Sequence, residues 1–404
     1  MVNGNNHVLR DTIRKASALR YGISGPMVAV DLVWQQKKNI GMILVSTAFL
    51  TYNSYLLQKS AFKIWKLVRI LKKRRNSNLR MMLFRGGYDM KYGFGADIGG
   101  TTIKIACFDL SGSMLKKWEI PTNTEKSGSL ILADLSASIN AFLEKEGIQK
   151  EQIIGIGVGV PGPISEDGIV NKCVNLGWNR IDLPLELSAL TGFRIIGGND
   201  ANVAALGECW KGGAQGSDNV VMVTLGTGIG GAIVVKGKII NGVHGAGGEI
   251  GHMLLKHEET EPCNCGKCGC AEQYCSATGI LRIAKHYLSE YTDSSSLRQR
   301  MPLECKDIFE EAEHGDGLAL AILEEVYKYL GLLLANVCCV ADPEIILLGG
   351  GVSKAGQPLI NGTTKYFQRY AFHACRTTEI KAATLGNDAG VYGAFKLLLD
   401  TIES

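Results

Sequence analysis

Four cysteines and a histidine stand close together in this chain. Cys263, Cys265, Cys268 and Cys270 fall within eight residues, and His252 precedes the first of them by eleven residues. Structural zinc takes four thiolate or imidazole ligands in a tetrahedron, and the short Cys-x-Cys spacing lets two thiolates close a tight loop around one ion. Free or disulfide-bonded cysteines are the alternative, but nothing else in the chain suggests secretion. The pattern therefore predicts a zinc-stapled loop.

A second chemical candidate is Asp200. It stands between a strand-like run, 194–198, and a helical run, 201–210. A carboxylate at the C-terminal end of a strand can accept a proton from a hydroxyl group. Phosphoryl transfer requires little more from the protein than such a proton acceptor, alignment of the hydroxyl group and neutralisation of charge. Capping of the following helix, by Asn199 or by Asp200, is the alternative role.

Three glycine-rich turns are candidates for phosphate or nucleotide binding, at 97–102, 225–231 and 349–351. Glycine lets the backbone approach an anion, and threonine adds N–H and hydroxyl donors. An ordinary hairpin turn explains any one of them alone, whereas two facing turns can clamp a polyphosphate. The Walker signature is absent, and the glycines of 155–159 lie inside a strand-like run, where close packing explains them better than a dinucleotide site.

The elements that must position these residues follow an α/β pattern. Apolar periodicity predicts strands at 92–97, 103–109, 115–120 and 153–160 and a helix at 130–146. This is the element order of the ribonuclease-H-like unit of the actin and hexokinase class. Strands expected at 219–225, 231–235 and 238–241 open a second copy, and a last helix, 389–399, is expected to cross back as part of a hinge.

The size of the chain agrees with more than one lobe. Its 404 residues are 46% hydrophobic and 20% charged, which exceeds what one core usually holds. We therefore predict two ribonuclease-H-like lobes with a central cleft: residues 90–207 with 388–404, and residues 208–387 with the cysteine loop.

Several motifs, taken in order, resemble one family. They are Asp97-Ile-Gly-Gly-Thr-Thr-Ile-Lys104, Asn199-Asp-Ala-Asn202, Leu225-Gly-Thr-Gly-Ile-Gly-Gly231, Gly248-Glu-Ile-Gly-His252 and the cysteine loop ending at Glu272. This series, from about Met90 to the C-terminus, resembles the ROK family (repressor, open reading frame, kinase), and most closely its bacterial glucokinases. The resemblance implies the actin/hexokinase ATPase fold, ATP-dependent formation of glucose 6-phosphate in the cytoplasm, and a homodimer.

The resemblance also implies a role for each motif residue. Asp200 is the general base, and Asp97 holds Mg²⁺ through water. Sugar hydroxyls bind to Asn199, Asp200, Glu249, His252 and Glu272. ATP and Mg²⁺ bind to Asp97, Gly99, Gly100, Thr101, Thr102, Lys104, Thr227, Gly228, Gly349 and Gly350. Zn²⁺ binds to His252, Cys263, Cys265 and Cys270, with Cys268 as a spare thiol that can substitute, and the second ring nitrogen of His252 remains for the sugar.

Two other functions compete with the glucokinase reading. One is a kinase for N-acetylmannosamine, N-acetylglucosamine or fructose, because local motifs do not set the 2-substituent of the sugar. The other is a sugar-responsive repressor of the same family, which places a DNA-binding winged helix ahead of the kinase fold. The N-terminal region lacks two short amphipathic helices flanking a glycine turn, so no nucleic-acid partner is expected.

Residues 1–89 differ from the remainder in charge. They hold 16 Lys and Arg against 3 Asp and Glu, a net charge of +13, whereas residues 90–404 hold 27 against 36, a net charge of −9. An uncharged run, 40–57, precedes a basic, amphipathic stretch, 62–75. Three readings stay open: translated upstream sequence, since Arg85-Gly86-Gly87 can be encoded by a ribosome-binding site before an initiator at Met90; a membrane-associated extension; and another module. A membrane partner is expected only under the second reading.

Overall fold

The computed structural model describes residues 32–37, 40–45 and 90–403. The chain divides into two compact units, 1–88 and 89–404, which are considered separately. In the first unit, β1 (Leu32–Lys37) and β2 (Ile40–Val45) pair as an antiparallel hairpin. The uncharged run at 40–57 therefore begins as a strand, while its remainder and the basic stretch at 62–75 lie outside the described residues.

The first five-stranded sheet of the second unit has the order β5-β4-β3-β6-β9. Its strands are β3 (Tyr92–Ile98), β4 (Thr102–Asp109), β5 (Met114–Pro121), β6 (Ile153–Val160) and β9 (Ile195–Asn199). The first three are antiparallel neighbours, and β6 and β9 run parallel to β3. The connections contain α4 (Glu125–Gly128), α5 (Ile131–Glu146), α6 (Leu183–Thr191) and the small hairpin of β7 (Ile169–Val170) and β8 (Ile181–Asp182). Buried apolar side chains of α5, such as Leu135 and Ile139, join those of the sheet in one core.

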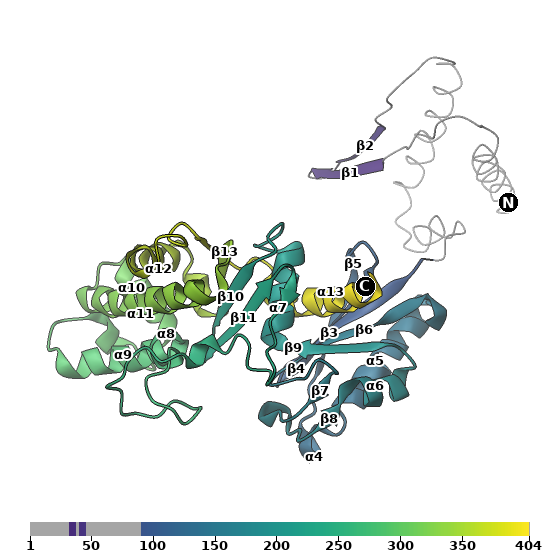
Figure 1. The fold of residues 1–404 in the computed structure, drawn as a ribbon, viewed down its shortest axis with the longest axis horizontal. Helices are drawn as coiled ribbons and strands as arrows, with labels where there is room; N and C mark the ends of the chain where they lie inside the picture. Colours follow the sequence, from purple (N-terminus) through teal and green to yellow (C-terminus); the bar gives the residue numbers. More distant parts are fainter. Residues whose placement is uncertain (1–31, 38–39, 46–89, 404) are drawn as a thin grey trace, which may run out of the picture. The chain divides into compact units, whose positions relative to one another are not determined.

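The second sheet repeats this plan, with the order β12-β11-β10-β13-β14. Its strands are β10 (Val220–Leu225), β11 (Ile229–Val235), β12 (Lys238–Ile239), β13 (Ile345–Gly349) and β14 (Glu379–Ala382). The helices α8 (Glu272–Cys275), α9 (Ala277–Glu290), α10 (Cys305–Glu313), α11 (Gly317–Ala341) and α12 (Gln357–Tyr370) form a large body beside it (Figure 1). The core of this half is built mainly from α11 and the strands β10 and β13.

Two helices, α7 (Asp200–Lys211) and α13 (Ala389–Glu403), lie between the two sheets (Figure 1). The last helix packs on β3 and β6 at backbone distance: a Cβ on Gly157 would lie 1.8 Å from the carbonyl oxygen of Ala394, and one on Gly95 would lie 2.0 Å from that of Val391. This contact confirms that the strand glycines serve close packing. It also brings the C-terminal helix back to the first sheet, as predicted.

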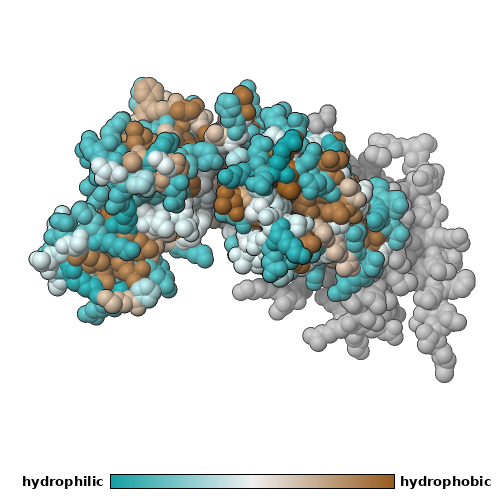
Figure 2. Space-filling view, turned by 90° about the horizontal axis from the view of Figure 1, so that it is seen from below, coloured by the Kyte–Doolittle hydropathy of each residue, from teal (hydrophilic) through white to brown (hydrophobic). Residues whose placement is uncertain are grey.

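The repeated sheet order and the strands predicted for each copy confirm the α/β fold of the actin/hexokinase type. The predicted boundary between residues 207 and 208 falls inside α7, so a continuous helix, rather than a loop, spans it. The assignment of 90–207 with 388–404 and of 208–387 to separate lobes stays a prediction. Among the described helices, none has the length and apolar character needed to cross a bilayer. On the face shown in Figure 2, hydrophobic side chains occur as separate patches among hydrophilic ones.

Candidate active site

Asp200 is the first residue of α7 and lies largely buried at the end of β9. The preceding residue, Asn199, caps the helix, because its Oδ1 accepts the backbone N–H of Asn202 at 3.2 Å. Only Oδ1 of Asp200 is occupied by the helix, accepting the N–H of Ala201 at 2.8 Å. Burial raises the pKa of Asp200, and the charge of Glu249 raises it further, against hydrogen bonds that lower it. Such a carboxyl group is suited to accept a proton, and Asn199 performs the capping that was the alternative role of Asp200.

The first glycine turn joins β3 to β4 and follows a partly buried acid. Asp97 lies near the end of β3, and its Oδ2 is 3.9 Å from Nζ of Lys104 on β4. Burial raises the pKa of Asp97 to about 6; Lys104 opposes this shift and Asp200 adds to it. The turn itself is held by a hydrogen bond from Gly99 N–H to Thr102 O at 3.0 Å. Its predicted members Gly99, Gly100, Thr101 and Thr102 thus lie together beside Asp97.

The second glycine turn joins β10 to β11, and the residues after the cysteine loop support it. The N–H of Ala277 donates to Gly226 O at 2.8 Å, and the hydroxyl of Thr278 donates to Thr227 O at 2.7 Å. A Cβ on Gly228 would lie 2.2 Å from Oε2 of Glu272, so a larger residue there would have to displace this carboxylate. The turn is thereby anchored on the N-terminal end of α9.

A cavity of about 680 Å³ opens between the second turn and the third glycine run. Gly226 and Thr227 line it on one side, and Gly351 follows Gly349 and Gly350 on the other. Sequence reasoning missed the remaining wall, which comes from α9, α10 and the segment after Gly351: Ala277, Cys305, Lys306, Phe309, Glu310, Glu313, Val352, Lys354 and Ala355. The cavity has the size of a small-molecule site, and two lysines beside glycine turns suit a phosphorylated ligand.

The cysteine loop brings together the four predicted metal ligands. Ligand atoms of His252, Cys263, Cys265 and Cys270 all lie within 4.8 Å of one another. Cys265 Sγ is 3.6 Å from Cys270 Sγ, and Cys263 Sγ is 3.8 Å from Nδ1 of His252. Zinc–ligand bonds of about 2.3 Å in a tetrahedron require ligand separations of about 3.7 Å, so this donor set fits zinc. Cys268 lies apart from the four, with its thiol 3.6 Å from Thr260 O.

The acids predicted to bind sugar lie around this loop in different settings. Glu249 is exposed, and its Oε2 is 4.0 Å from Nε2 of His252, so the imidazole presents one nitrogen to the thiolates and the other to Glu249. Glu272 instead uses Oε2 to accept the N–H of Ile229 at 2.9 Å, and its Oε1 is 3.6 Å from Cys263 Sγ. Glu272 therefore links the cysteine loop directly to the second glycine turn, a contact that sequence reasoning did not foresee.

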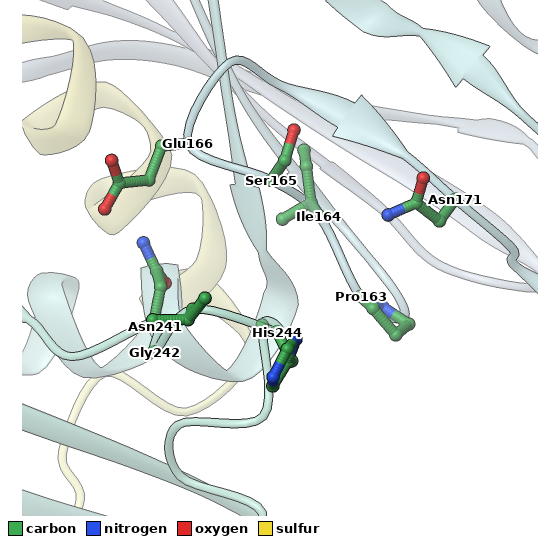
Figure 3. A pocket seen from close by; sticks show the side chains of 10 residues that line it. Pro163, Ile164, Ser165, Glu166, Asn171, Asn241, Gly242 and His244 are labelled. Atoms are coloured by element: carbon green, nitrogen blue, oxygen red, sulfur yellow. The ribbon is translucent and has the colours of Figure 1, made fainter.

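A larger cavity, of about 740 Å³, lies between the loop after β6 and the loop after β12. Figure 3 shows Ser165 and Glu166 on the first loop and Asn241 on the second, with the Asn241 amide directed toward Glu166. The first loop is tied to the candidate base, because Asn199 Nδ2 donates to Gly162 O at 3.1 Å. None of the ten lining residues was predicted: Pro163, Ile164, Ser165, Glu166, Asn171, Asn241, Gly242, Val243, His244 and Gly245. The four glycines between 242 and 248 were a signal for this second loop.

The chain was compared with known proteins. The model of the ROK family matches residues 93–401. A glucokinase of Halalkalibacterium halodurans is 43% identical over 304 residues, 74% of this chain and 92% of that protein. An N-acetyl-D-glucosamine kinase of Yersinia enterocolitica is 29% identical, over 76% of this chain and 98% of that protein.

A solved structure is similar to this chain over the same part of its length. It is the ROK family glucokinase from Streptomyces griseus in complex with glucose and AMPPNP, with a TM-score of 0.61 and 30% identity over 76% of this chain and 98% of that one. The family match spans both sheets, all three glycine turns and the cysteine loop. This chain therefore belongs to the ROK family.

Proposed function

We propose that this protein is an ATP-dependent glucokinase that forms glucose 6-phosphate. The observation that carries the proposal is the setting of Asp200: its carboxyl group is partly buried and has a raised pKa, and Asn199 caps the helix in its place. The relatives named as glucokinases, and the glucose and AMPPNP held by one of them, support the same reaction.

The chemistry follows from the chain's own groups. Asp200 accepts the proton of the 6-hydroxyl group of glucose as the oxygen attacks the γ-phosphorus of ATP; the bond from this phosphorus to the β,γ-bridging oxygen breaks, and ADP leaves. The N–H groups of the turns at 99–102 and 226–228 align the phosphates, and the adenosine occupies the cavity beside Gly351. Asp97 is placed to hold Mg²⁺ through water; when bound, Mg²⁺ neutralises charge on the phosphates. Glu249 and the free nitrogen of His252 bind sugar hydroxyls.

Zinc completes the sugar-binding loop in this proposal. Its four ligands are His252, Cys263, Cys265 and Cys270, which the donor distances support. A ligand bond at Nδ1 of His252 leaves Nε2 to face the sugar and holds the ring in one orientation. The metal then has a structural role and takes no part in the phosphoryl transfer.

A kinase for an N-acetylated hexose is the second candidate, and one observation favours keeping it: a relative is named N-acetyl-D-glucosamine kinase.

A panel of sugars separates the candidates. Purified protein is assayed with Mg²⁺ and ATP against glucose, mannose, fructose, N-acetylglucosamine and N-acetylmannosamine. We expect kcat/KM for glucose to exceed that of every other sugar at least tenfold. A higher kcat/KM for either acetylated sugar would replace glucokinase with the second candidate, and turnover of none of them would contradict a hexose kinase. A homodimeric state and a cytoplasmic location stay predictions, the first testable by sedimentation.

A further inference from the structure

A buried acid outside the proposed site joins the two halves of the enzyme. Glu208, near the end of α7, has no exposed surface. Its Oε2 accepts backbone N–H groups from Gly213 at 2.7 Å and Thr384 at 3.0 Å, and its Oε1 accepts that of Leu385 at 2.7 Å. These three backbone hydrogen bonds, with a longer one of 3.5 Å from the hydroxyl of Thr384, satisfy a polar side chain that would otherwise be costly to bury.

The three donors belong to the two segments that connect the sheets. Gly213 lies in the segment from α7 to β10, through which the chain passes from the first sheet to the second. Thr384 and Leu385 lie in the segment from β14 to α13, through which it returns. A carboxylate has two acceptor oxygens with several lone pairs, so one side chain can hold both segments at once.

The two helices beside this contact differ in which sheets they touch. Phe395 of α13 packs with the buried side chains of the first sheet, whereas α7 touches both sheets: its Ala205 packs with the second sheet, and its Val203 lies against Gly159 and Gly198 of the first. The helices touch through glycine: a Cβ on Gly393 would lie 1.5 Å from Val203 O, and one on Gly207 would lie 2.3 Å from Ala389 O. The pair therefore lies where the two halves must move against each other if they close.

We propose that Glu208 is a positioning residue that clamps both connecting segments and sets the axis about which the two halves close on the sugar. This inference rests on the proposed kinase function. Asp200 begins the same helix that carries Glu208, so the clamp also determines where the base stands relative to the second glycine turn. Substrates contact neither Glu208 nor its three donors in the proposed site.

Weakening the hydrogen bonds of Glu208 should lower kcat with the sugar while leaving ATP binding unchanged. ATP still binds to the second half, because the cavity at Gly351 receives no side chain from α7. Phosphoryl transfer to the sugar requires both halves in register, so kcat with the sugar falls. Closure that is poorly guided also leaves water at the γ-phosphate, so more ATP is hydrolysed for each sugar phosphate formed.

The test compares Glu208→Gln with a matched control, Asp316→Asn. Asp316 also accepts three backbone N–H groups, from Ser296, Leu318 and Ala319, but all of them lie among the helices of the second half. For each variant, kcat, the KM values of sugar and ATP, the ATP hydrolysed per sugar phosphate, and the sugar-induced change in radius of gyration by X-ray scattering are measured.

For Glu208→Gln we expect kcat to fall at least tenfold, wasted ATP to rise severalfold and compaction on adding sugar to shrink, with KM for ATP within twofold of wild type. Asp316→Asn should lose thermal stability but keep kcat and compaction. Equal behaviour of the two variants would overturn the clamp, because it would reduce Glu208 to a stabilising contact.

A second pair of variants applies if Glu208→Gln does not fold. Leu385 has a φ of −76°, which proline tolerates, so Leu385→Pro removes one donor of the clamp and Leu385→Ala is the control for the lost side chain. We expect the proline variant alone to lower kcat and compaction, and identical results for both would overturn the inference.

Every comparison uses the sugar that the wild type turns over best. If the wild type phosphorylates no sugar, both the proposed function and the clamp are wrong. If the wild type is active and the variants behave like it, only the clamp is wrong.

Discussion

The two sheets of the second unit share one strand order but carry different residues near the end of their central strands, β3 and β10. In the first sheet, Asp97 of β3 pairs with Lys104 of β4. At the corresponding place in the second sheet, Thr224 of β10 pairs with Gly230 of β11. A charged pair in one copy is thus replaced by a hydroxyl and a glycine in the other.

This difference indicates that the two copies of the turn contribute different chemical groups. The first half contributes charge: a partly buried acid of raised pKa with an ammonium group 3.9 Å away. The second half contributes backbone, since its turn is held by hydrogen bonds from Ala277 and Thr278 and lies against the carboxylate of Glu272. A nucleotide between them would meet metal-binding chemistry on one side and bare backbone on the other.

The largest effect is expected at the helix between the halves. Asp200→Asn keeps Oδ1 for the N–H of Ala201 and removes the base, so kcat should fall roughly 10²- to 10⁴-fold, the usual contribution of general base catalysis. Steady-state assays give kcat, and calorimetry should show glucose affinity within about threefold of wild type. Turnover near that of wild type would reduce Asp200 to a structural residue and leave the reaction without an assigned base.

Asp97→Asn tests the charged half directly. Its pKa is raised from 3.8 to about 6, so the folded state holds a proton that the unfolded state releases, and the wild type loses stability as the pH rises from about 4 to about 6. The asparagine variant has no such penalty. Without ligands at pH 7 it should be more stable by at most about 3 kcal/mol, while kcat falls at least tenfold.

Thermal unfolding between pH 4 and pH 8 checks the stability part of this prediction. The gain of Asp97→Asn over wild type should be absent near pH 4 and constant above about pH 6. Thr224→Val, at the matching position of the second sheet, is the control and should show no pH-dependent gain. The same pH profile in both variants would contradict the contrast between the halves.

A smaller effect is expected from the cysteine loop. Cys265→Ser should lower zinc content and raise the KM for glucose about tenfold, because His252 loses its fixed orientation. The KM for ATP should change less, about two- to threefold, since Ala277 and Thr278 still hold the second turn although Glu272 connects it to the loop.

Metal analysis and kinetics of Cys268→Ser provide the control for the cysteine loop, because this thiol lies apart from the four ligands. The control should retain zinc and both KM values. A fully active wild type without zinc would contradict the role of the metal, and an equal rise of both KM values in Cys265→Ser would point to general loosening of the second half.

The smallest effect is expected outside both halves. The family match begins at residue 93, and residues 89–404 form a unit of their own. A protein that starts at Met90 should therefore fold and show kcat and glucose KM within twofold of the full chain. Loss of solubility or activity on this truncation would show that residues 1–89 contribute to the enzyme and would exclude translated upstream sequence.

Local patterns predicted most strands of both halves to within about three residues at each end, but not β7, β8 or β14. The helix expected at 130–146 begins one residue later, and the strand at 153–160 was predicted with its observed bounds. Alternating or continuous apolar runs and glycine turns carry this information within a few residues of chain. The helices α9 to α12 were not predicted individually, and the strand expected at 238–241 ends at Ile239.

The sequence by itself indicated the family, the glycine turns and a cluster of cysteines with a histidine, because each depends on residue types at short spacing, and the resemblance to the family then named the candidate base and the candidate metal ligands. Only the tertiary structure decided how these parts are joined. Glu272 meets Ile229 across 43 positions, and Glu208 meets Leu385 across 177. Such pairs leave no periodic trace in the chain, since either partner alone reads as an ordinary surface acid or loop residue. The physical reason is that a buried carboxylate is satisfied by whichever backbone donors the fold brings to it, and those donors carry no sequence signature.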